Sequence, residues 1–194
     1  KCSVHRISAR YLAEFGYECY RNAFRRYNNV KYMKCNEFKE KILQLIGYEN
    51  IFEHWGVFIK NKLVGYVECI IESEKGVSTS VIKYDPDYLV YYSSYAMMDT
   101  LLSYYVNKKG LPLSNGNRSI SHDTNIQDFL LKFGFNRKYC HLNIHYRRSI
   151  KLAIQLMYPL RKKIRLSKKM NKLSTILFQE ELRKACNQIP PINY

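Results

Sequence analysis

The chain has 194 residues, of which 46% are hydrophobic and 25% are charged, and its 18 tyrosines and nine phenylalanines make it rich in aromatic side chains. These values are typical of one globular domain with a buried core, and they exclude a chain dominated by low-complexity disorder. No window approaches the roughly 18 apolar residues that span a bilayer, so we expect a cytoplasmic protein. Residues 147–186 carry 12 Lys and Arg against two Glu, a net charge of +10 out of the total of +16.

Two helices are predicted first. Apolar residues recur at helical spacing from Ser8 to Tyr27, and again from Cys35 to Ile46, where Asn36 is the expected N-cap and Gly47 the expected end. The apolar period then changes to that of strands. A hairpin is predicted from segments 55–59 and 63–71, and a third strand, rich in β-branched residues, from segment 77–84.

The second half alternates helices and strands. In order, we predict a helix from Ser94 to Gly110, a short strand over 111–114, a helix ended by Gly134, and one bent strand or two short ones over 135–146. A hairpin followed by alternating strands and helices predicts an α/β fold, in the mixed α+β sense, with helices on both faces of a mixed sheet.

This element order resembles the GNAT N-acetyltransferase superfamily. Residues 125–135, Asn-Ile-Gln-Asp-Phe-Leu-Leu-Lys-Phe-Gly-Phe, look like that family's late helix and its Gly-Phe ending, and Gly65-Tyr66 matches its second hairpin strand. The stretch from Val77 to the helix at Ser94 is similar to the strand, loop and helix that hold the pyrophosphate of acyl-CoA. The resemblance implies a GNAT-like domain over residues 1–146, with a sheet that splays around the pantetheine arm, and leaves residues 147–194 as a helical extension.

The resemblance also implies acetyl-CoA or another acyl-CoA as co-substrate, without a metal. A helix N-terminus offers unpaired N–H groups to a phosphate. The implied cofactor-binding residues are Ser93, Ser94, Tyr95, Ala96 and Asn125. The family's phosphate loop reads Gln/Arg-x-x-Gly-x-Gly/Ala, whereas residues 87–96 of this chain contain no glycine. Many members carry a tyrosine general acid where this chain has Leu130 and Leu131.

The densest polar cluster lies between Ser114 and Asn125. His122 is a candidate general base because an unperturbed histidine titrates near neutral pH, and Asp123 is placed to orient it. Arg118 can hold a carboxylate or phosphate through two parallel hydrogen bonds. Asn115 and Tyr84 complete the predicted substrate site. The competing interpretation is a polar loop in which Asp123 or Thr124 caps the next helix.

Two further groups of acids are candidates. Glu68 could serve as a base if the strand face that it shares with Tyr66 and Ile70 meets the substrate, or it could be an exposed ion-pairing residue. Asp85 and Asp87 could form an active-site pair, although Asp-Pro-Asp is also typical of a turn that ends a strand.

The predicted function is transfer of an acetyl-like group from acyl-CoA to a small-molecule amine. One alternative is a GNAT-like binding module without activity. Another is one half of a tandem protein similar to Fem-type aminoacyltransferases, which would use aminoacyl-tRNA. The basic helices predicted after residue 147 could pack on the domain, lie on an anionic membrane surface, or contact nucleic acid such as tRNA.

Overall fold

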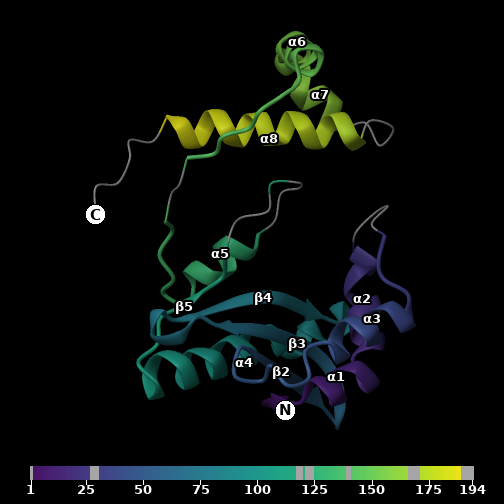
Figure 1. Cartoon of the computed structure of the whole chain (residues 1–194), viewed down its shortest axis with the longest axis vertical. Coiled ribbons are helices and arrows are strands. Elements are labelled where there is room, and N and C mark those ends of the chain that lie inside the picture. The colour runs from purple at the N-terminus through teal and green to yellow at the C-terminus, as the bar shows by residue number, and fades with distance from the viewer. Residues whose placement is uncertain are drawn as a thin grey trace. The chain divides into compact units, whose positions relative to one another are not determined.

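Figure 1 shows the computed structural model, which describes residues 2–26, 31–116, 120, 125–138, 141–165 and 171–188. The chain divides into two compact units, Lys1–Gly116 and Asn117–Tyr194. The functional division expected between residues 146 and 147 falls inside the second unit and stays a prediction.

The first unit is built on a five-stranded mixed sheet with the order β1-β2-β3-β4-β5. The strands are β1 (Cys2–Ile7), β2 (Phe52–Ile59), β3 (Lys62–Ile71), β4 (Val77–Tyr84) and β5 (Leu113–Ser114). The first four pair antiparallel, and β5 runs parallel to β4. The predicted hairpin, third strand and mixed sheet are confirmed. Strand β1 was not predicted, because Ser3, His5 and Arg6 interrupt its apolar pattern and only its pairing with β2 makes it a strand.

Helices and short helical turns complete the first unit. They are α1 (Ala9–Phe15), α2 (Tyr17–Ala23), η1 (Phe24–Arg26), α3 (Cys35–Leu43), η2 (Ser73–Lys75), η3 (Pro86–Tyr91), α4 (Ser93–Leu101) and η4 (Leu102–Lys108). The predicted first helix is two helices that meet at Gly16, where a Cβ would lie 2.5 Å from the main-chain oxygen of Leu12. The expectation that Asn36 caps α3 was wrong. The cap is at Lys34, whose N–H donates to the Glu37 carboxylate over 2.9 Å.

Two hydrophobic clusters lie on opposite faces of the sheet. The cluster of α1, α2 and α3 includes Leu12, Phe38 and Tyr66, and all three are fully buried. The cluster of α4 packs Met97 and other apolar side chains against strand residues of the opposite face. This arrangement confirms helices on both faces, and from Tyr66 onward it assigns alternate residues of β3 to opposite sides as their spacing predicts.

The second unit is helical among its described residues. It contains α5 (Ile126–Leu131), α6 (Arg148–Met157), η5 (Tyr158–Leu160), α7 (Arg161–Arg165) and α8 (Asn171–Asn187). The strand predicted over 135–146 was wrong for residues 135–138 and 141–146, which form none. Alternating apolar residues make a strand only when a neighbouring strand accepts their main-chain hydrogen bonds. None of the described helices is long and apolar enough to cross a membrane.

Candidate functional site

The pairing between β4 and β5 ends after two residue pairs. Val77 pairs with Leu113 and Ser78 with Ser114, and no strand of the described residues pairs with this edge of β4 from Thr79 onward. Figure 1 shows β5 as a short strand at one end of β4. The side chain of Thr79 connects the two chain segments where they separate, because its hydroxyl donates to Asn115 Oδ1, directly after β5, over 2.7 Å. The sheet therefore has an open parallel edge, as the splayed sheet expected from the resemblance requires.

The open edge presents main-chain donors. The N–H of Asp85, directly after β4, donates to the carbonyl oxygen of Val64 on the β3 side over 2.8 Å. Because alternate N–H groups of a strand point to opposite edges, those of Ile82 and Tyr84 point to the side that β5 has left. Such groups can bind the carbonyl oxygen of a chain lying along the edge, or stabilise an oxyanion.

A bulge lies on β4 close to this divergence. Cys69 pairs with Thr79 and Glu68 with Val81, so Ser80 is the extra residue. Its hydroxyl donates to Glu68 Oε1 over 2.6 Å, and His54 Nε2 lies 3.3 Å from Glu68 Oε2. His54 is buried, Glu68 is largely buried and Ser80 is exposed. The three side chains form a hydrogen-bonded chain across β2, β3 and β4.

Glu68 is held as a carboxylate. Its burial favours the neutral form, but the hydrogen bonds of His54 and Ser80 and the charge of Lys41 outweigh that effect and lower its pKa. Glu68 was predicted as a candidate base from its strand position, but neither His54 nor Ser80 was predicted as its partner. The pairing of His54 with Glu68 depends on the register of the hairpin, and the contact of Ser80 depends on the bulge. Neither leaves a signal in the spacing of the residues.

The turn from β4 into α4 forms the other part of the site. Tyr92 has φ 60° and ψ 29°, a left-handed conformation, directly before α4 begins at Ser93. Glycine usually occupies such a position because a Cβ is unfavourable there. The side chain of Tyr92 is exposed, and its ring contacts that of Tyr95 in the first turn of α4, with the ring centroids 5.9 Å apart. The loop has no glycine, and yet Tyr92 adopts the left-handed conformation that glycine usually provides.

The predicted phosphate-binding residues differ in their availability. Ser93 is fully buried, and its hydroxyl donates to the main-chain oxygen of Tyr88 over 3.2 Å. The N–H of Ala96 donates to Tyr92 O over 3.0 Å. The side chains of Ser94 and Tyr95 are partly or fully exposed in the same turn. First-turn amides have no partner within their own helix, so the main chain ahead of Ala96 is the part of this turn suited to an anion.

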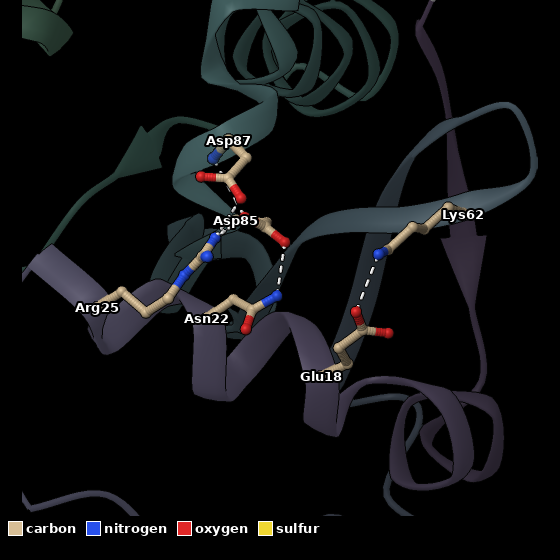
Figure 2. Close-up of polar contacts among 6 residues, drawn as sticks. All are labelled: Glu18, Asn22, Arg25, Lys62, Asp85 and Asp87. Atoms are coloured by element: carbon tan, nitrogen blue, oxygen red, sulfur yellow. Dashed lines mark hydrogen bonds and ion pairs between the residues drawn. The ribbon is translucent and has the colours of Figure 1, made fainter.

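Figure 2 shows how this turn is anchored to α2. Asp85 is only 2% exposed, and its carboxylate accepts hydrogen bonds from Asn22 Nδ2 over 2.7 Å and from Arg25 over 3.0 Å. Arg25 also binds Asp87 over 2.6 Å, and the Asp87 N–H donates to Asp85. Burial, together with the nearby Asp85, raises the pKa of Cys19 to about 12. These contacts favour the interpretation of Asp85 and Asp87 as a structural turn.

Tyr84 lies on the opposite side of the sheet from Glu68. Its ring packs on Gly65, where a Cβ would come within 2.3 Å of Tyr84 Cδ1, and it belongs to the cluster on the α4 face. Its hydroxyl is buried without a hydrogen-bond partner, and burial raises its pKa. The structure therefore does not bring these two predicted site residues together on one face.

The remaining predicted residues fall into two groups. Arg118, His122 and Asp123 lie outside the described residues. Asn125 is the N-cap of α5 and belongs to the second unit. Among the residues that the structure describes, no three His, Cys, Asp or Glu side chains gather into a group that could hold a metal ion.

No family model matches the sequence, and no curated protein matches it significantly. Solved structures do match. An acetyltransferase from Thermus thermophilus has a TM-score of 0.58 at 10% identity, over 73% of this chain and 89% of its own. AAC(6')-Iy, in complex with the bisubstrate analogue CoA-S-monomethyl-acetylneamine, has a TM-score of 0.56 at 10% identity, over 76% and 99%. A protein assigned to the GNAT acetyltransferase family, from Desulfovibrio desulfuricans, has a TM-score of 0.55 at 14% identity, over 76% and 92%. The likeness confirms the predicted fold.

Proposed function

We propose that this chain, which has the GNAT acetyltransferase fold, is an N-acyltransferase that moves an acetyl-like group from acyl-CoA to a small-molecule amine. The observation that carries the proposal is the early end of β4–β5 pairing, after Ser78 and Ser114. It leaves main-chain donors on the β4 edge, beside a bulge whose Ser80 hydroxyl donates to the Glu68 carboxylate of β3. A sheet whose only role was structural would be more stable if the pairing of β4 with β5 continued.

The acyl donor has a matching place on this chain. The N–H groups of Ile82 and Tyr84 suit the amides of a pantetheine arm, which extended backbone can bind as it binds another strand. The first turn of α4 suits the pyrophosphate, because its amides and the helix dipole favour an anion. Ser94 and Tyr95 are in the turn that would face it.

Acyl-CoA supplies an activated thioester, and this chain would supply the base and the oxyanion donors. As the amine attacks the carbonyl carbon, the carbon–sulfur bond breaks and the amine loses a proton. Glu68 takes this proton, directly or through the hydroxyl of Ser80, which passes its own proton to the carboxylate. His54 positions the Glu68 carboxylate through its contact with Oε2, the oxygen that Ser80 does not bind. The leaving thiolate is protonated from solvent, because leucines stand where many family members have a tyrosine.

A second base is proposed from the polar segment between β5 and α5. His122, oriented by Asp123, would take the proton in place of Glu68, and Arg118 and Asn115 would hold an anionic part of the acceptor. Asn115 is attached to β4 through Thr79, so it lies at the divergence of the two strands. Separate substitution of Glu68 and His122 decides between the two bases.

A module without activity is the alternative function. It is favoured by Tyr92, which puts a large side chain where the family's loop has glycine, and by Leu130 and Leu131 in the late helix. A tandem partner of Fem type, with aminoacyl-tRNA as donor, also remains open. Both alternatives predict that the chain does not bind acetyl-CoA.

Binding of acetyl-CoA to the full chain tests the proposal. A ligand present at 100 times its dissociation constant stabilises the native state by about 2.7 kcal/mol, so we expect a clear rise in melting temperature. The matched control is Thr79→Val, which removes the hydroxyl that holds Asn115, a proposed contact of the acceptor, and should leave the binding of acetyl-CoA unchanged. Absence of any shift at millimolar acetyl-CoA, in wild type and variant alike, would refute the acyltransferase.

A further inference from the structure

An apolar ridge is exposed on α6 and η5. Leu152, Leu156 and Leu160 follow one another at four-residue spacing and are 60%, 71% and 53% exposed. Residues four apart lie on one side of a helix. Ile154, which points to the other side of α6, is buried. The helix therefore uses one apolar side for packing and leaves a second apolar side in solvent, which is costly unless another surface covers it.

Cations border the ridge at both ends. Residues 147–165 contain seven Lys and Arg and no Asp or Glu. Arg147, Arg148 and Lys151 are exposed around the start of α6, and Lys162 and Lys163 are exposed in α7. Arg161 instead makes contacts within its own unit. Its guanidinium stacks on the Tyr158 ring, and its Nε lies 3.7 Å from Glu181 Oε1. The exposed cations are thus concentrated where the exposed leucines are.

We propose that this surface, defined by Leu152, Leu156, Leu160 and the cations beside them, docks on an anionic lipid membrane. A helix with leucines on one side and Lys and Arg next to them lies in the interface between headgroups and acyl chains. The anionic headgroups of the membrane attract each cation, and its acyl chains bury each leucine. The helix lies on the membrane rather than across it, since α6 spans only residues 148–157.

Charge argues against the other occupants. Residues 1–116 carry 16 Lys and Arg against 12 Asp and Glu, a net +4, and the whole chain carries +16. Both the first unit and a second copy of the chain are therefore positively charged overall, so neither attracts this surface through its net charge. Nucleic acid is negatively charged, but proteins bind it through cations and stacking aromatic side chains. It provides no apolar surface that would bury three leucines. An anionic bilayer matches both features of the surface.

Vesicle co-sedimentation of the full chain tests the proposal. We expect binding to vesicles of phosphatidylcholine with phosphatidylserine and weak binding to phosphatidylcholine alone. The variant L152Q/L156Q should bind roughly tenfold more weakly for each leucine, and K162Q/K163Q about fivefold more weakly for each lysine at low salt. Leu43→Gln, an exposed leucine of α3 in the first unit, is the matched control and should bind as wild type does.

Three outcomes would overturn the proposal. The first is a wild-type chain that does not bind the anionic vesicles. The second is undiminished vesicle binding by L152Q/L156Q, which would reduce the contact to charge alone. The third is tighter binding to a single-stranded RNA than to vesicles, retained in L152Q/L156Q, which would identify nucleic acid as the partner. Circular dichroism of each variant confirms that α6 is still helical, and none of these readouts depends on acyl transfer.

Discussion

The buried acids of the first unit and the cations of the proposed docking surface in the second unit differ in their partners. In the first unit the buried acids have specific partners: Asp85 binds Asn22 and Arg25, Glu68 binds His54 and Ser80, and Glu53 binds Arg6 over 2.8 Å. In the second unit the cations of α6, with Lys162 and Lys163 of α7, stand in solvent. A buried charge is tolerated only when its partners hold it in one geometry, whereas an exposed charge is free to meet an external surface. Paired charges therefore mark the proposed chemistry, and exposed charges mark the proposed docking surface.

The largest expected effect is on catalysis and concerns Glu68. Substitution Glu68→Gln keeps the size of the side chain but removes the base, and general base catalysis is worth roughly 100-fold or more. We expect kcat for acetyl transfer to fall by at least that factor while the affinity for acetyl-CoA stays unchanged. Release of the CoA thiol measures the first and calorimetry the second. If kcat survives in Glu68→Gln but falls in His122→Gln, the base is His122.

The same carboxylate makes a stability prediction with a definite sign. Because the pKa of Glu68 is lowered in the folded state, its ionisation stabilises the fold above the unfolded pKa of about 4.3. That contribution is lost as the pH falls through the lower folded pKa. Wild type should therefore be more stable than Glu68→Gln near neutral pH, and the two should converge in acid. A constant difference in the free energy of unfolding across this range would show that Glu68 contributes by packing alone.

The next effect concerns Asp85, which anchors the turn between β4 and α4. Asp85→Ala removes the acceptor of Asn22 and of Arg25 and leaves a buried amide without a partner. We expect a loss of roughly 3 kcal/mol in the free energy of unfolding, discounted for the half-exposed Arg25. Urea denaturation measures it. Asp99→Ala, an exposed acid in α4, is the control and should change stability little. Equal effects of the two substitutions would contradict the role of Asp85 as an anchor.

The smallest effect belongs to the exposed cations. K162Q/K163Q should change the free energy of unfolding by less than about 0.5 kcal/mol, since solvated surface charges contribute little to stability. The same variant is expected to weaken vesicle binding about fivefold for each lysine at low salt. A large loss of stability would mean that these lysines pack within their unit, and the contrast between the two units would then fail.

Sequence patterns were sufficient where structure depends on neighbours along the chain. The hairpin turn is one case: a tight turn was predicted between segments 55–59 and 63–71, and Lys60 and Asn61 form it, both with positive φ. The bounds of β4 and the start of α3 at Cys35 are others. The predicted strand over 135–146 failed because alternation is necessary for a strand but does not supply its partner. The predicted cap of α3 failed because the helix begins at Cys35, so Asn36 is already its second residue and the N-cap position is Lys34, whose N–H donates to Glu37.

By itself, the amino-acid sequence determined the hairpin, the mixed α/β order, the separation of a nearly balanced first part from a basic second part, and Glu68 as a candidate base. Only the tertiary structure decided that β1 joins the sheet, that β5 leaves β4 after two pairs, and that His54 and Ser80 meet Glu68. The physical reason is that register and bulges are set by contacts between strands far apart in the chain. A slip of one residue would turn each of these side chains to the other face of the sheet.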